Sequence, residues 1–205
     1  MPVVIATRNR GKVAEFARLL GARFQVEPLP AACSTPAETG SSFAENALIK
    51  ARHAFQCLGG ERAVLADDSG IEVFALGGRP GVESARFAGV GAGDAANVAK
   101  LLAELAPHAD RRARFVCVLA LLLPGGTAAG DLERVFLAEG VLEGTVERTP
   151  RGAGGFGYDP IFRPEGWERT LAEVTGGSKD AVSHRGRAVA ELVRRLAGEK
   201  VFGAA

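Results

Sequence analysis

The stretch Ala63-Val64-Leu65-Ala66-Asp67-Asp68-Ser69-Gly70 joins a short apolar run to two adjacent carboxylates, a hydroxyl and a glycine. Four apolar residues bounded by polar and turn residues are typical of a strand buried in the core. In open α/β sheets, ligand sites form just beyond the carboxyl ends of strands. We therefore expect residues 63–66 to form a buried strand that delivers the acid groups to a cleft. The alternative is an ordinary turn, because Asp, Ser and Gly are also common turn residues.

The two neighbouring carboxylates, Asp67 and Asp68, repel each other and need a compensating charge. A divalent cation supplies such a charge, since a hard ion such as Mg²⁺ is bound through one or two carboxylates while substrate phosphates complete its shell. The pair therefore indicates metal-assisted chemistry on a phosphate compound.

The N-terminal segment combines a strand, a polar loop and a helix. Residues 3–6 predict a buried first strand, Thr7–Lys12 a loop, and the following apolar spacing a helix that ends at Gly21. This order suits a phosphate cradle, because the N–H groups and the dipole at a helix start attract anions. The loop lacks the Walker A spacing, and taken alone it is better explained as a capped connection between strand and helix.

A second helix is expected after a loop rich in Pro, Ala, Ser and Thr. Ser42 opens it, Glu45 completes a capping box, and Gly59-Gly60 ends it. Lys50 lies on its polar face, either as a solvated lysine or as a charge for a phosphate group.

The remainder of the chain alternates strands and helices. Residues 71–74 predict a half-buried strand, and Asp94 caps a helix. Residues 115–123 predict the central strand and 134–142 a further one, before a final amphipathic helix that includes Leu196. A length of 205 residues fits one domain, or one domain with two lobes.

Two glycine-containing segments near the C-terminus carry candidate base-binding groups. Phe156 and Tyr158 offer faces on which a base can stack, and Asp159 with His184-Arg185 can supply an acceptor and donors to its edge. The alternative is that both aromatic rings belong to the core and that His184 serves the start of a helix.

The net charge and the apolar pattern disfavour nucleic-acid-binding, membrane-spanning and secreted proteins. The net charge is +1 without a long basic run, which disfavours nucleic-acid binding. The longest apolar run, residues 115–123, is too short to span a bilayer, and the N-terminus does not resemble a signal peptide. Three scattered cysteines, Cys33, Cys57 and Cys117, lead us to expect free thiols in a reducing cytoplasm.

Six short motifs occur in a fixed order along the chain. They are Thr-x-Asn-x-x-Lys at 7–12, Ser-Phe-x-Glu-Asn-Ala at 42–47, Ala-Asp-Asp-Ser-Gly at 66–70, Leu-Gly-Gly-x-Pro-Gly at 76–81, Gly-Phe-Gly-Tyr-Asp-Pro at 155–160 and Ser-His-Arg-Gly at 183–186. Together they resemble the inosine/xanthosine triphosphate pyrophosphatase family, from about Val3 to about Leu196.

The resemblance implies an α/β protein with two lobes, a long mixed β-sheet flanked by helices, and an active-site cleft between the lobes. It implies one catalytic domain over residues 1–205, usually in a cytoplasmic homodimer. The implied reaction is the hydrolysis of non-canonical purine nucleoside triphosphates (dITP, ITP and XTP) to the monophosphate and pyrophosphate, with Mg²⁺ as cofactor.

The resemblance also implies roles for individual residues. Asp68 would be the general base and a metal ligand, with Glu38 and Asp67 as further candidate ligands. Arg8 departs from the common Thr-Gly-Asn pattern of the first motif. The implied substrate-binding residues are Thr7, Arg8, Asn9, Arg10, Gly11 and Lys12 for the triphosphate, Lys50 for its charge, Ser69 for a further contact, and Phe156, Gly157, Tyr158, Asp159, Lys179, His184 and Arg185 for the nucleotide and its base.

Three other functions compete with this interpretation. A non-catalytic nucleotide sensor could use the same pocket, although binding a triphosphate gains nothing from two uncompensated anions. A related pyrophosphatase could act on modified pyrimidine triphosphates. An RNA-binding protein is disfavoured by the near-neutral charge.

Overall fold

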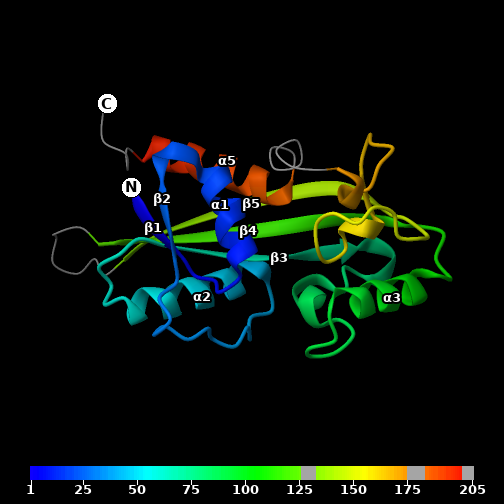
Figure 1. Cartoon of the computed structure of the whole chain (residues 1–205), viewed down its shortest axis with the longest axis horizontal. Coiled ribbons are helices and arrows are strands. Elements are labelled where there is room, and N and C mark those ends of the chain that lie inside the picture. The colour runs from blue at the N-terminus through cyan, green and yellow to red at the C-terminus, as the bar shows by residue number, and fades with distance from the viewer. Residues whose placement is uncertain (126–132, 175–182, 200–205) are drawn as a thin grey trace. The chain divides into compact units, whose positions relative to one another are not determined.

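The structure is a computed structural model that describes residues 1–125, 133–174 and 183–199 (Figure 1). In these ranges six strands form one sheet in the order β2-β1-β3-β4-β5-β6. β1 pairs in parallel with β2 and β3, whereas β5 and β6 are antiparallel, so the predicted mixed sheet flanked by helices is confirmed. The elements are β1 (Pro2–Ile5), α1 (Arg10–Leu20), β2 (Gln25–Pro28), α2 (Phe43–Cys57), β3 (Val64–Val73), α3 (Asp94–Leu105), β4 (Arg112–Pro124), β5 (Glu133–Val146), β6 (Phe162–Pro164) and α5 (His184–Gly198).

The chain divides into two compact units. The first comprises Met1–Asp68, Val118–Gly140 and Arg185–Ala205, and the second comprises Ser69–Cys117 and Val141–His184. The long strands β3, β4 and β5 each contribute residues to both units.

In the first unit, α1 and α5 cover one face of the strands and α2 covers the other (Figure 1). The side chain of Asn9 caps α1 by accepting from the N–H groups of Gly11 and Lys12. Ser42 caps α2 as predicted, but the Glu45 carboxylate binds Ser41 rather than Ser42, so the capping box is shifted by one residue. These caps place the first turns of α1 and α2.

The strand β3 does not end at Ala66. It continues through Asp67, Asp68 and Gly70 to Val73, so the predicted strand end is wrong and the two predicted strands are one. Lys12 and Arg185 compensate Asp67, and Lys50 compensates Asp68, so the two neighbouring carboxylates can lie within one strand. The parallel neighbour β1 does end here: Ile5 pairs with Leu65, which puts Asp67 level with Thr7, just beyond the carboxyl end of β1.

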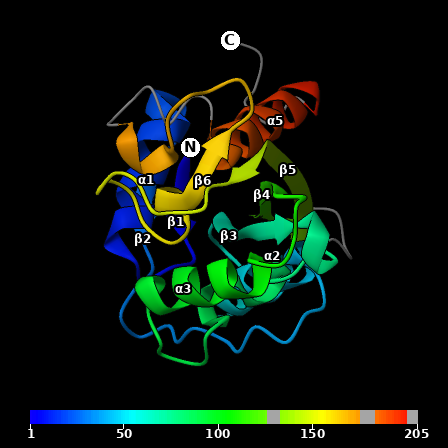
Figure 2. The ribbon, with the colours of Figure 1, turned by 90° about the vertical axis from the view of Figure 1, so that its right-hand side faces the viewer.

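The second unit has its own core, built around Ile71, Leu101 and Phe162. Its strand β6 pairs with the end of β5, with Thr145 opposite Arg163 (Figure 2). The prediction that Asp94 caps α3 is wrong, because Gly93 is the N-cap. Asp94 is the first helical residue, and its carboxylate instead accepts from the Gly157 N–H at 2.6 Å.

Two of the three cysteines are paired. A disulfide joins Cys33 to Cys57, whose Cα atoms lie 5.9 Å apart, and only Cys117 is a buried free thiol. The expectation of three free thiols is therefore wrong. Cys33 lies in the loop before α2 and Cys57 at the end of that helix, so their proximity depends on tertiary packing that residue spacing does not reveal. Among the described residues, no helix is long and apolar enough to cross a membrane.

Candidate active site

Asp67 is buried on the face of β3 that α1 and α5 cover. Its Oδ2 atom accepts from Lys12 Nζ at 2.9 Å and from Arg185 Nε at 3.5 Å. Arg185 also reaches Glu15 at 3.5 Å through a second guanidinium nitrogen. Asp67 is thus fixed between a cation at the start of α1 and a buried cation at the start of α5.

Asp68 points to the opposite face, because successive side chains of a strand alternate. Its carboxylate accepts from Lys50 Nζ at 2.7 Å and from the Asn46 amide at 3.3 Å, both on α2. The same Lys50 ammonium donates to Glu38 at 2.9 Å. Glu38 and Asp68 therefore converge on one cation.

The two neighbouring carboxyls have opposite acidities. Burial, the largest influence, would by itself raise the pKa of Asp67, but the surrounding cations, led by Lys12 and Arg185, hold that pKa far below its usual range. Burial raises the pKa of Asp68, because Lys50 offsets only part of the lost hydration. Asp67 is consequently the stronger acid, whereas Asp68 is the better proton acceptor.

Lys50 keeps its positive charge in spite of its surroundings. Burial, the strongest influence, lowers the pKa of a lysine, but Asp68 and Asp67 outweigh it and the net pKa is raised. An ammonium that stays charged can neutralise an incoming phosphate.

The loop between β1 and α1 is held by hydrogen bonds of its own. Asn9 caps the helix, and its own N–H donates to Thr7 Oγ1 at 3.2 Å. Gly11 keeps this turn open, since a Cβ there would lie 3.1 Å from Asn9 Oδ1. Arg10 is exposed, and Arg8 extends to the backbone of the loop before α2.

A hollow of about 270 Å³ in the first unit brings several predicted site residues together. It includes two lysines and two carboxylates, the mixture that a metal-bound triphosphate requires. The lining residues are Ala6, Thr7, Lys12, Thr35, Pro36, Glu38, Lys50 and Asp67.

The donor set fits a hard divalent cation. Carboxylate oxygens from Glu38 and Asp68 already meet at a single ammonium, and oxygen is the ligand that Mg²⁺ prefers. No group of three or more acidic, His or Cys side chains that could hold a metal occurs in the described ranges. Water and substrate phosphates would have to complete the shell.

The predicted base-binding turn in the second unit is tightly organised. The Asp159 carboxylate accepts from the Phe156 N–H at 3.0 Å, and Gly157 adopts a positive φ of 61°. Tyr158 is buried, with its hydroxyl donating to the Ser84 carbonyl at 2.8 Å. Of the side chains of Phe156, Tyr158 and Asp159, only that of Phe156 is exposed, at 51%.

The remaining predicted residues are divided between the two units. Ser69 is half-buried in the second unit, where His184 is buried with its ring stacked on Phe115 at 4.8 Å. Arg185 belongs to the first unit through Asp67 and Glu15. Lys179 lies outside the described residues.

Sequence reasoning missed one polar residue that the structure places at the acid pair. Asn46 is completely buried; its amide nitrogen donates to Asp68, and its oxygen accepts from the Gly40 N–H at 2.8 Å. A Cβ at Gly40 would lie 2.8 Å from that oxygen. The signal was available, since Asn46 is four residues before Lys50 on one helix face and inside a quoted motif.

Comparison with known proteins identifies the family of the chain. The family model described as the Ham1 family matches residues 3–195. The chain belongs to the Ham1 family. It is 48% identical to the dITP/XTP pyrophosphatase of Geobacillus kaustophilus, over 93% of this chain and 91% of that protein. It is likewise 48% identical to the dITP/XTP pyrophosphatase of Mycobacterium tuberculosis H37Rv, over 95% of this chain and 94% of that protein.

Solved structures of Ham1 proteins share the fold. The Staphylococcus aureus Ham1 protein superimposes with a TM-score of 0.85 at 38% identity, covering 98% of this chain and 100% of that one. A HAM1 protein from Coxiella burnetii gives a TM-score of 0.84 at 41% identity, with 97% and 99% covered. This Ham1 chain therefore matches its relatives over nearly its whole length.

Proposed function

We propose that this Ham1 protein hydrolyses the non-canonical purine nucleoside triphosphates dITP, ITP and XTP to the monophosphate and pyrophosphate. The observation that carries the proposal is the difference in acidity between the neighbouring residues Asp67 and Asp68. One strand presents a carboxyl of lowered pKa on one face and a carboxyl of raised pKa on the other. The relatives named dITP/XTP pyrophosphatases supply the substrate class.

In the proposed reaction, Asp68 accepts a proton from a water that attacks the α-phosphorus, and pyrophosphate leaves. A base of raised pKa is better matched to this transfer than a strongly acidic carboxyl. Lys12 and Lys50 balance the negative charge of the triphosphate, and the loop Thr7–Lys12 holds it beside the start of α1, whose dipole favours an anion. Catalysis is then mainly positioning and charge neutralisation.

Mg²⁺ is the proposed cofactor. Asp68 and Glu38 would hold it, with Asp67 nearby, and it would neutralise phosphate charge and lower the pKa of a bound water. The ammonium of Lys50, now shared by Glu38 and Asp68, would then face the substrate phosphates.

We propose that the base is recognised by the exposed Phe156 ring and by donors near His184. Hypoxanthine and xanthine carry a 6-oxo acceptor, whereas adenine carries a 6-amino donor, so a donor in the protein rejects adenine. The contacts of Arg185 assign it to the acid pair, and those of Tyr158 and Asp159 assign these two residues to shaping the Phe156 turn.

The broader organisation is part of the proposal. The whole chain, residues 1–205, would act as one catalytic domain in a cytoplasmic homodimer. These expectations rest on the family, and sedimentation of the purified protein tests the dimer.

The decisive experiment measures pyrophosphate release from dITP, ITP, XTP, dATP, dGTP and a modified pyrimidine triphosphate, with and without Mg²⁺. We expect fast, Mg²⁺-dependent release from the first three alone. Equal cleavage of dATP or dGTP would contradict the selectivity. Binding of dITP without turnover would favour the nucleotide sensor instead.

A further inference from the structure

The loop between β2 and α2, residues 29–40, is held in place chiefly by its ties to other segments. It contains neither helix nor strand, yet Thr35, Pro36 and Glu38 from it line the hollow of the candidate active site. We call residues 29–40 the 29–40 loop. Its position determines where Glu38 meets Lys50.

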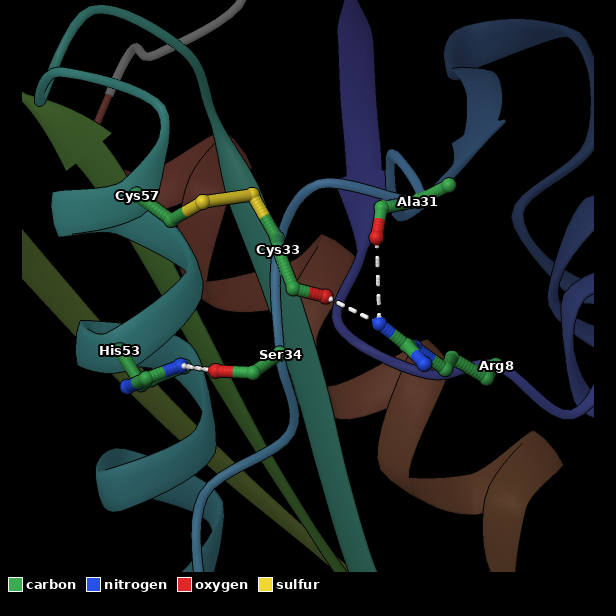
Figure 3. The surroundings of a disulfide bond; sticks show 6 residues. All are labelled: Arg8, Ala31, Cys33, Ser34, His53 and Cys57. Atoms are coloured by element: carbon green, nitrogen blue, oxygen red, sulfur yellow. Dashed lines mark hydrogen bonds between the residues drawn. A yellow bond between two sulfur atoms is a disulfide. The ribbon is translucent and has the colours of Figure 1, made fainter.

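Three side-chain ties hold the first half of the 29–40 loop (Figure 3). The disulfide joins Cys33 to Cys57, the last residue of α2, and Ser34 Oγ lies 2.8 Å from His53 Nε2 on the same helix. From the other side, one guanidinium nitrogen of Arg8 donates to the carbonyls of Cys33, at 2.8 Å, and Ala31, at 3.2 Å.

Cys33 takes part in both the disulfide and the hydrogen bond from Arg8. Its sulfur is bonded to α2, the helix that carries Lys50, while its carbonyl accepts from Arg8 of the loop Thr7–Lys12 (Figure 3). Thr7 and Lys12 line the hollow, whereas Arg8 is not among its lining residues and donates to the 29–40 loop instead. The Arg8 side chain thus links the loop Thr7–Lys12 to the 29–40 loop.

The disulfide is open to exchange at one end. Cys57 is exposed, whereas Cys33 is only 2% exposed. A dithiol can therefore attack the Cys57 sulfur through one thiolate, and Cys33 leaves as a thiolate that takes up a proton. The second thiol of the dithiol then displaces Cys57, giving two cysteine thiols and one oxidised dithiol, with two electrons transferred.

We propose that Arg8 is a positioning residue whose hold on the loop Thr7–Lys12 depends on the Cys33–Cys57 disulfide, so that reduction by a dithiol weakens triphosphate binding. The inference rests on the proposed function. In a reducing compartment, a disulfide that forms is usually transient, and it is often redox-sensing. The reduced and oxidised proteins would then differ in substrate affinity rather than in chemistry.

The test compares oxidised and dithiol-reduced protein in dITP hydrolysis, at a temperature well below both melting transitions. We expect reduction to raise KM roughly five- to tenfold, the scale of one or two lost hydrogen bonds. The kcat should stay within about twofold, because the acid pair is not touched. Thiol titration in denaturant confirms each state, with one reactive thiol before reduction and three after it.

Variants distinguish the effect of the Arg8 contact from a general loss of stability or activity. Arg8→Ala should raise KM in the oxidised protein by the same factor, reduction should add little to it, and Arg8→Lys should restore part of the affinity. The double variant Cys33→Ser/Cys57→Ser should behave as the reduced protein and ignore the dithiol. Arg18→Ala, which removes an exposed charge from α1, and Cys117→Ala should both keep the full redox response.

Hydrogen exchange gives a readout that does not require turnover. Reduction should speed amide exchange in the 29–40 loop and in Thr7–Lys12, but not in α3. Unchanged exchange in both segments, or an unchanged KM in a protein that hydrolyses dITP, would overturn the inference and leave the proposed function standing. If neither redox form hydrolyses any triphosphate, the proposed function fails, and the exchange data alone decide whether the Arg8 contact depends on the disulfide.

Discussion

Asp67 and Asp68 are neighbours on β3, yet they are bound by different cations on opposite faces of the strand. Asp67 contacts Lys12 at 2.9 Å, and Asp68 contacts Lys50 at 2.7 Å. Their pKa values are displaced in opposite directions, downward for Asp67 and upward for Asp68. Paired titratable groups with such separated acidities are a common arrangement for dividing catalytic roles.

Replacement of the proposed base should abolish turnover and spare binding. We expect Asp68→Asn to lower kcat for dITP by roughly 10²- to 10⁴-fold, the usual contribution of a general base. Asn keeps the shape of the side chain and can still contact Asn46. Pyrophosphate release and equilibrium binding of dITP provide the two measurements.

The matched variant for this test is Asp67→Asn on the other face of the strand. It should weaken dITP binding, because Lys12 and Arg185 lose their shared anion and move. Turnover near the wild-type value in Asp68→Asn would remove Asp68 from the role of base.

The same two variants should differ in stability. Breaking a buried ion pair by removing one partner leaves the other charge uncompensated, so Asp67→Asn should lower the free energy of unfolding by about 3 kcal/mol. For a chain of this size, that is a fall in Tm of roughly 6–12 °C. Asp68→Asn should cost less, because Lys50 still donates to Glu38 and burial already disfavours the charged form of Asp68. Thermal unfolding with a chelator present measures both, and a larger loss in Asp68→Asn would contradict the assigned contacts.

Acid should change both of these differences from wild type. The folded pKa of Asp67 lies below its unfolded value of about 3.9, so its stabilising effect is present above that pH and lost as the pH falls. The folded pKa of Asp68 is raised, so its effect favours folding below about pH 3.9 and is lost as the pH rises through the folded pKa. Wild type and Asp67→Asn should therefore converge in Tm as the pH falls below about 4. Asp68→Asn should gain on wild type as the pH rises toward neutrality.

The local signals in the sequence predicted most elements of the fold. The apolar run 115–123 is within β4, and the amphipathic pattern of the last helix matches α5. What failed depended on contacts between distant segments. The Asp67-Asp68 pair indicated a strand end, because the compensating Lys12 and Lys50 are 55 and 18 residues away. The Cys33–Cys57 disulfide was missed for the same reason.

The candidate site could also be predicted only in part from the sequence. Residue types and order were enough to single out Asp68, Lys12 and Lys50 as site residues, and these side chains do lie at one acid pair. The sequence did not show that Asn46 is buried against Asp68, nor that Tyr158 is held by the Ser84 carbonyl. Whether a polar side chain on a helix faces the core or the solvent is decided by tertiary packing.

Lys50 should control the acidity of the proposed base. Its ammonium lowers the pKa of Asp68 and partly offsets the effect of burial, so Lys50→Met should raise that pKa further. The acid limb of kcat/KM for dITP at saturating Mg²⁺ should then move to higher pH, and the plateau should fall roughly 10²-fold, the usual scale for one lost transition-state donor. Lys12→Met is the matched control, because Lys12 pairs with Asp67 and not with Asp68: it should lower the plateau and leave the limb in place. An identical shift in both variants would show that the limb reports the net charge of the hollow rather than the titration of Asp68.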